Sequence, residues 1–191
     1  MQDRSLEVAN VENQIAAYSN LSLPLLEALV SQDARAHLVR MFRDPYVLEP
    51  GERTELIDQL RRAVAVEPKI SGLRVLLGMT LCVNLEVQDA LEELRDAVRL
   101  APDNFIARLK LGELLMRLRI CSEAADETLA AAKLAATSMQ AELARRQAET
   151  IRTMQREGIE RGGYHKLRST FSRTKRWFLR STQRATALTS R

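Results

Sequence analysis

The chain has 191 residues, a formal net charge of +4, 46% hydrophobic residues and only 4% aromatic residues. Glycine and proline are scarce, while Ala, Leu, Glu and Arg predominate, which favours helices and argues against a β-sandwich or barrel. The start shows no basic flank before an apolar core, and no run of about 18 apolar residues occurs, so we expect a cytoplasmic protein without a secretory signal or transmembrane helix.

The N-terminal part of the chain predicts three helical stretches. Residues 1–23 form the first, an N-terminal helical segment whose apolar side chains include Leu6, Val11, Ile15 and Tyr18. A helix from Pro24 to Phe42 follows, because Pro suits the first turn of a helix. After a linker, residues 44–51, the pattern predicts a third helix from Glu52 to Val66.

The middle of the chain predicts two pairs of helices. One pair runs from Ser71 to Ala101 with a break near residues 84–85, and the next runs from Asn104 to Ala135 with a break near residues 119–120. Pro68 and Pro102 separate the units, because Pro cannot continue a helix and forces the preceding residue into an extended conformation.

These pairs repeat one another with an offset of 34 residues. Two glycines and two prolines from a sparse supply coincide at this offset, so chance is a poor explanation. Glycine inside a helix costs about 1 kcal/mol relative to alanine, and this cost is tolerable where a paired helix must approach closely. The matches are Leu77-Gly78 with Leu111-Gly112, Ala90 with Ala124, Ala97 with Ala131, Pro68 with Pro102, and Leu60 with Leu94.

The pattern resembles the tetratricopeptide repeat, in which each unit is a pair of antiparallel helices. The resemblance implies an all-α solenoid of about three units over residues 24–136, of which 24–68 is degenerate and 71–102 and 105–136 are well matched. The large aromatic residues common in the family are absent: Arg74 and Arg108 replace Trp, and Leu81 and Leu115 replace Tyr. The competing interpretation is an irregular helical bundle.

Residues 137–158 predict a helix that caps the last unit. We expect Ser138 to cap it at the start and Gly158 to end it after Glu157. Its charged faces would keep the end of the solenoid soluble. The apolar residues expected along one side are Met139, Leu143, Ile151 and Met154.

The resemblance also implies a groove, lined by the first helix of each unit, that binds segments of other proteins. The residues expected there are Val75, Met79, Cys82, Leu109, Glu113 and Met116, with Arg117 at the edge. This mainly apolar, flexible surface suits an apolar or amphipathic segment. Alternatively, the same residues pack against Leu6–Tyr18. Some family members hold acidic chaperone tails with polar groove residues, but Val75 and Met79 stand at those positions, so we do not expect that ligand.

Residues 159–191 form a basic tail. From Gly158 to Arg191 there are nine Lys and Arg residues against the single acid Glu160, which leaves the rest of the chain mildly acidic. Such a tail can lie on an anionic membrane surface, neutralise nucleic-acid phosphates, or stay solvated or docked on an acidic surface. Its basic residues include Lys166, Arg168, Arg173, Lys175, Arg176, Arg180 and Arg184.

The sequence carries no motif for catalysis. It lacks a phosphate-binding glycine loop, a Gly-x-Ser-x-Gly elbow and paired His or Cys residues at metal-binding spacing. His37 and His165 are isolated, and Cys82 and Cys121 are expected to be reduced thiols of the core. We therefore expect no enzyme, cofactor, metal or small-molecule substrate.

The leading prediction is a protein-interaction adaptor, scaffold or chaperone-like binder that uses the groove for a protein or peptide partner. The alternative is a peripheral protein that binds nucleic acid or an anionic membrane surface through the basic tail. A small specialised chaperone of bacterial secretion systems is a third interpretation, because such proteins also use about three repeats. Binding through the tail should weaken steeply with salt, whereas binding through an apolar groove should hardly change.

Overall fold

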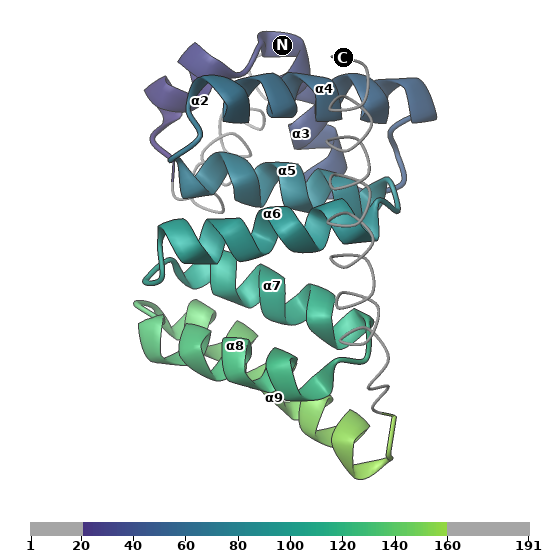
Figure 1. Cartoon of the computed structure of the whole chain (residues 1–191), viewed down its shortest axis with the longest axis vertical. Coiled ribbons are helices and arrows are strands. Elements are labelled where there is room, and N and C mark those ends of the chain that lie inside the picture. The colour runs from purple at the N-terminus through teal and green to yellow at the C-terminus, as the bar shows by residue number, and fades with distance from the viewer. Residues whose placement is uncertain (1–20, 160–191) are drawn as a thin grey trace, which may run out of the picture.

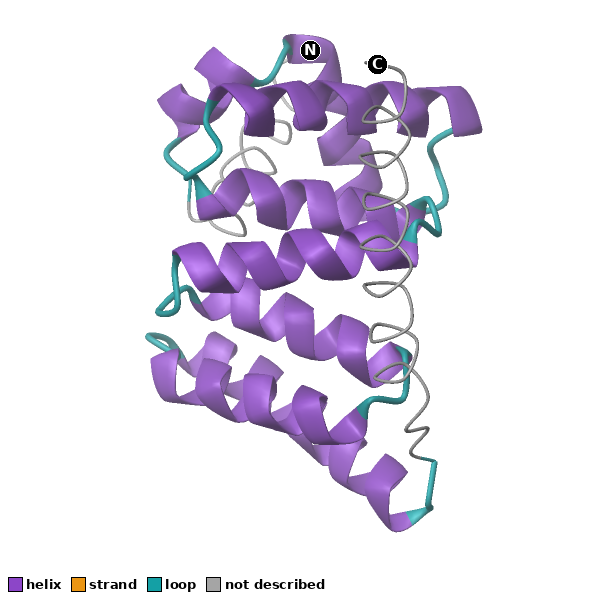
Figure 2. Ribbon diagram, viewed as in Figure 1, coloured by secondary structure: helices purple, strands orange, loops and turns teal. Residues whose placement is uncertain are grey.

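The computed structural model describes residues 21–159, and every element in that range is an α-helix (Figure 2). The helices stack along the long axis of the molecule, from α2, α3 and α4 at one end to α9 at the other (Figure 1). This arrangement confirms the predicted all-α solenoid. The helices are α2 (Leu23–Leu29), α3 (Gln32–Arg43), α4 (Pro50–Val66), α5 (Ser71–Val83), α6 (Val87–Leu100), α7 (Phe105–Arg117), α8 (Cys121–Leu134) and α9 (Ser138–Arg156).

The first helical stretch differs from its prediction. We expected one helix from Pro24 to Phe42, but the chain breaks between α2 and α3. Val30 is extended and only 1% exposed, so its side chain is anchored in the core. Ser31 then caps α3, because its side-chain oxygen accepts a hydrogen bond of 3.3 Å from the backbone N–H of Ala34. The prediction was wrong because a buried Val and a capping Ser outweigh the helical pattern around them.

The helix pairs α5/α6 and α7/α8 turn in the same way at positions 34 residues apart. Leu85 and Arg119 both have positive φ values, 64° and 59°, although neither is glycine. In each turn, the next backbone N–H donates to a carbonyl five residues back: Glu86 to Leu81 at 3.0 Å and Ile120 to Leu115 at 2.9 Å. The predicted breaks are confirmed, and the shared backbone geometry shows that the sequence repeat is also a structural repeat.

The two repeated glycines mark close contacts between paired helices. A Cβ atom on Gly78 would lie 2.8 Å from Cγ of Leu94 and 3.3 Å from the carbonyl oxygen of Ala90. A Cβ atom on Gly112 would likewise lie 3.3 Å from the carbonyl oxygen of Ala124. The predicted close approach at both glycines is therefore confirmed.

Arginines occupy the positions where tetratricopeptide repeats commonly have Trp. Nη1 of Arg74 lies 2.6 Å from the carboxylate of Glu93, and Nη1 of Arg108 lies 2.8 Å from that of Glu127. In both units Nε donates to the carbonyl of the proline that closes the preceding unit. Each guanidinium therefore ties the start of a unit to its own second helix.

A second set of ion pairs joins neighbouring units. Nη2 of Arg61 on α4 lies 3.4 Å from Asp89 on α6, and Nη2 of Arg95 on α6 lies 2.8 Å from Glu123 on α8. Both the arginines and the acids are 34 residues apart. The second helices are thus linked by a repeated contact, and the degenerate first unit takes part in it.

Helix α9 closes the stack, with one correction at its start. Thr137, and not Ser138, caps it, because Oγ1 of Thr137 accepts a hydrogen bond of 3.2 Å from the N–H of Gln140. At the other end Gly158 has a φ of 66°, and the N–H of Ile159 donates to the carbonyl of Met154 at 2.9 Å. The predicted role of Gly158 is confirmed.

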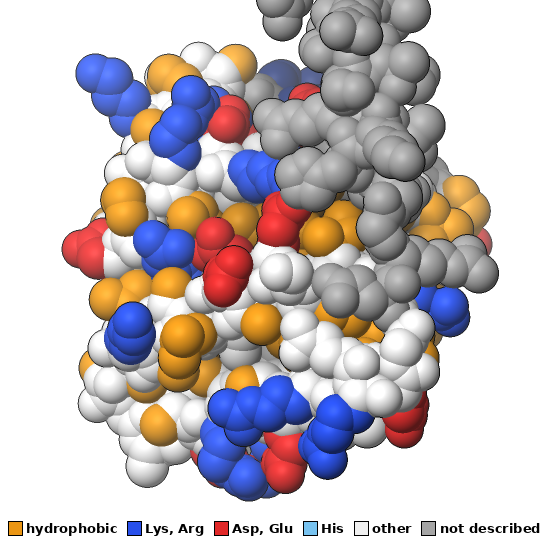
Figure 3. Space-filling view, turned by 60° about the horizontal axis from the view of Figure 1, so that its bottom comes forward, with side chains coloured by type: hydrophobic (Ala, Val, Ile, Leu, Met, Phe, Trp, Pro, Cys, Tyr) orange, Lys and Arg blue, Asp and Glu red, His pale blue; other side chains and the backbone are white. Residues whose placement is uncertain are grey.

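The buried side of α9 also differs from its prediction. Ile151 is fully buried and Met154 is half-buried, but Met139 and Leu143 are 73% and 40% exposed. Gln147 explains the orientation, since its Nε2 donates to Oγ1 of Thr128 at 2.7 Å and so fixes α9 against α8. Figure 3 brings this end of the molecule forward and shows cationic and anionic side chains beside one another there.

Within residues 21–159, no helix is both long and apolar enough to cross a membrane.

Candidate functional site

The predicted groove residues lie on α5 and α7, which are neighbouring first helices, but two of them are not on the surface. Val75 is fully buried and Leu109 is 7% exposed. Both belong to a buried cluster that includes Phe105 and Ile106 at the start of α7. Val75 and Leu109 therefore belong to the contact between the two units, which corrects the expectation that they face a partner.

The other five residues do reach the surface. Met79 and Cys82 on α5, together with Glu113 and Met116 on α7, are half-buried, and Arg117 is exposed. We call these five residues the α5–α7 surface. It combines flexible thioether side chains, a thiol and charged groups, so it offers both apolar and polar contacts to a ligand.

Two charged residues of this surface, Glu113 and Arg117, form a group on α7 with the neighbouring Lys110. The carboxylate of Glu113 accepts hydrogen bonds from Nζ of Lys110 at 3.0 Å and from Nη2 of Arg117 at 2.8 Å. Burial acts to raise the pKa of Glu113, but the two cations outweigh this effect and hold the pKa below its usual value. The carboxylate is therefore charged at neutral pH, and the group carries one net positive charge. We did not single out Lys110 from the sequence, although its spacing of three residues from Glu113 was a visible signal.

Cys82 lies close enough to this charged group on α7 for the charges to affect the pKa of its thiol. Burial raises the pKa of the Cys82 thiol to about 11, while the nearby Arg117 acts in the opposite direction. The thiol is protonated at neutral pH and is therefore a contact group and not an activated nucleophile. Cys121 is fully buried in the core, as predicted. Among residues 21–159, no cluster of three or more His, Cys, Asp and Glu side chains could hold a metal ion.

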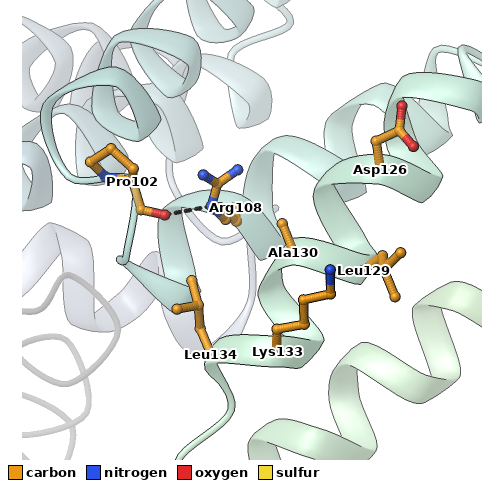
Figure 4. A pocket seen from close by; sticks show the side chains of 7 residues that line it. All are labelled: Pro102, Arg108, Asp126, Leu129, Ala130, Lys133 and Leu134. Carbon is orange, nitrogen blue, oxygen red and sulfur yellow. Dashed lines mark hydrogen bonds between the residues drawn. The ribbon is translucent and has the colours of Figure 1, made fainter.

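A hollow of about 290 Å³ lies beside α8 (Figure 4). Arg108 borders it and is held there by the carbonyl of Pro102. Leu129, which is 57% exposed, supplies apolar surface. The equivalent of Leu129 in the preceding unit is Arg95, so the apolar lining is particular to α8. The lining residues are Pro102, Arg108, Asp126, Leu129, Ala130, Lys133 and Leu134.

Two predicted segments of the chain lie largely outside the described residues. These are the N-terminal segment, residues 1–20, and the basic tail from residue 160 onwards. The tail residues concerned are Lys166, Arg168, Arg173, Lys175, Arg176, Arg180 and Arg184.

No protein-family model and no curated protein matches the sequence. The structure, however, is similar to solved tetratricopeptide-repeat domains. The TPR2B domain of yeast Sti1, in a complex with pHsp70, gives a TM-score of 0.54 at 11% identity over 64% of this chain and 96% of that one. The first repeat domain of Spaghetti (RPAP3), bound to an HSP90 peptide, gives 0.51 at 18% identity over 65% and 95%.

The second repeat domain of human RPAP3, in complex with an HSP70 peptide, gives a TM-score of 0.50 at 16% identity over 63% of this chain and 92% of that one. At these identities the similarity shows the fold. The chain therefore has the fold of a tetratricopeptide-repeat domain, as the resemblance of its repeats predicted.

Proposed function

We propose that this protein is a non-catalytic adaptor, or chaperone-like binder, that holds a segment of another protein on its α5–α7 surface. The observation that carries the proposal is the composition of that surface. Met79, Cys82 and Met116 are half-buried and adaptable, and they adjoin a charged group with one net positive charge. An amphipathic segment with apolar side chains and an acidic group would satisfy both parts.

The fold supports a segment of another protein as the ligand. The solved domains of the same fold described above are complexes with pHsp70, with an HSP70 peptide and with an HSP90 peptide. An acidic chaperone tail nevertheless fits poorly as the ligand here, because Met79 on the surface is apolar and Val75, at the other expected clamp position, is apolar and buried beneath it, so neither can hold a carboxylate. A partner whose affinity comes mainly from apolar side chains fits better.

The proposal is tested by affinity capture from native lysate with full-length baits. Met79→Glu places a charge on the α5–α7 surface and should abolish capture of the partner. Val66→Glu is the matched control, because Val66 lies on α4 and is already 68% exposed. Circular dichroism should show the same helical content for both variants and the wild-type protein.

Salt separates this function from binding through the basic tail. A partner held by apolar contacts should stay on the wild-type and Val66→Glu baits through a high-salt wash. If Met79→Glu retains that partner as well as Val66→Glu does, the α5–α7 surface is not the binding site. If the baits hold only nucleic acid or lipid, and only at low salt, the tail is the functional element.

A further inference from the structure

The α5–α7 surface has two properties that any occupant must match. Its apolar residues, Met79, Cys82 and Met116, are only half-buried by the rest of the described chain. Beside them, Lys110 and Arg117 contribute two positive charges against the single carboxylate of Glu113. An occupant should therefore present an apolar stripe flanked by acidic residues.

The 20 residues that precede the described part of the chain have this composition. Val8, Val11, Ile15 and Tyr18 are spaced by three or four residues, which would place them on one face of a helix. The charged residues of the segment are three acids and one arginine: Asp3, Glu7, Glu12 and Arg4. The segment is thus apolar on one side and carries a net negative charge, opposite to that of the surface.

The segment is also long enough to reach this surface. Leu21 is 7% exposed and belongs to the main core, so the segment leaves the molecule from a fixed point at the α2–α3 end. Helix α4 packs on α5 and α5 packs on α7, and packed helices lie about 8–10 Å apart, so these two steps span about 20 Å. Twenty helical residues extend about 30 Å, which covers that distance.

We propose that residues 1–20 dock on the α5–α7 surface and occupy it until a partner displaces them. This regulation rests on the function proposed above. Charge favours this segment over the other terminal segment of the chain, because the basic tail would bring further positive charges to Lys110 and Arg117. A displaceable segment of the same chain would lower the apparent affinity for every partner in proportion to the fraction of time that the surface is uncovered.

Cys82 provides a native probe for this contact in the full-length protein. It lies on the α5–α7 surface and is half-buried, whereas Cys121 is fully buried. The rate of maleimide addition to Cys82, followed by mass spectrometry at constant pH, therefore reports how often the surface is uncovered. Ile15→Glu places a charge within the apolar stripe, and Asn13→Glu places the same charge on the opposite face of the expected helix.

The expected result is that Ile15→Glu raises the rate of Cys82 modification by about tenfold or more, as for release of a local contact, while Asn13→Glu leaves it unchanged. Equal rates for wild type and both variants would overturn the proposal. So would a rate that responds to Phe171→Glu in the tail instead, or one that falls with rising protein concentration, which would indicate a second copy. The assay needs no partner, so its outcome is independent of the capture experiment.

Discussion

The contact at Gly78 allows the effect of a single added carbon to be worked out. In Gly78→Ala the new Cβ atom would lie 2.8 Å from Cγ of Leu94, well inside the optimal carbon–carbon separation of about 3.5–4.0 Å. Leu94 is 1% exposed and cannot swing into solvent, and the backbone oxygen of Ala90 stands 3.3 Å away. Overpacking of this kind costs about 1–3 kcal/mol, and the gain in helix propensity returns about 1 kcal/mol. We therefore expect Gly78→Ala to lower the free energy of unfolding by up to about 2 kcal/mol.

Gly51 supplies the control for this prediction. It lies in the first turn of α4, and a Cβ atom there would meet nothing within 4 Å. Gly51→Ala should therefore be neutral or should stabilise the protein by about 0.5 kcal/mol. Urea unfolding followed by circular dichroism measures both variants. If Gly78→Ala proves as stable as Gly51→Ala, the close contact between α5 and α6 is not present in solution.

Three further predictions concern the turns, the repeated arginines and the thiol. Leu85→Gly should raise the free energy of unfolding by about 1 kcal/mol, because Leu85 is exposed and has a φ of 64°; an unchanged urea midpoint would refute this strain. Arg108→Ala should lower the free energy of unfolding by about 1 kcal/mol, whereas Arg62→Ala, at an exposed arginine, should leave it unchanged. Equal effects of the two substitutions would show that the ion pair of Arg108 with Glu127 does not stabilise the fold. In a Cys121→Ala background, the rate of Cys82 alkylation should rise about tenfold per pH unit until the pH approaches 11, because only the thiolate reacts. A rate that stops rising near pH 8 would contradict the raised pKa of the buried thiol.

The helices from α5 to α8 could be predicted from the sequence because their repeated residues are packing constraints. Gly78 and Gly112 stand where a side chain would collide with the paired helix, and Pro102 stands between two units. Matches of this kind at one offset determine where each helix starts and turns. The positions of the turns were predicted, but their backbone conformation was not, because Leu85 and Arg119 adopt a conformation that usually signals glycine.

Other features depend on contacts between distant residues and could not be predicted from periodicity. The helical pattern continues through Val30 and Ser31, and only the burial of one and the capping hydrogen bond of the other break it. Val75 was placed on the groove by its position in the repeat, but the start of α7 covers it. The sequence shows that Trp is absent from the position of Arg74. That Arg74 forms an ion pair with Glu93 instead could be seen only once the two helices of the pair were placed together.

The matched ion pairs have a consequence for how the chain can change in length. A copy of residues 71–104 inserted after Asn104 would place a second Asp89 opposite Arg95, in the arrangement already seen between Arg61 and Asp89. Because stability in such arrays is close to a sum over neighbours, the added unit would bring its own helix-pair contacts together with this ion pair. Tandem duplication during replication is thus a route by which this protein gains whole units.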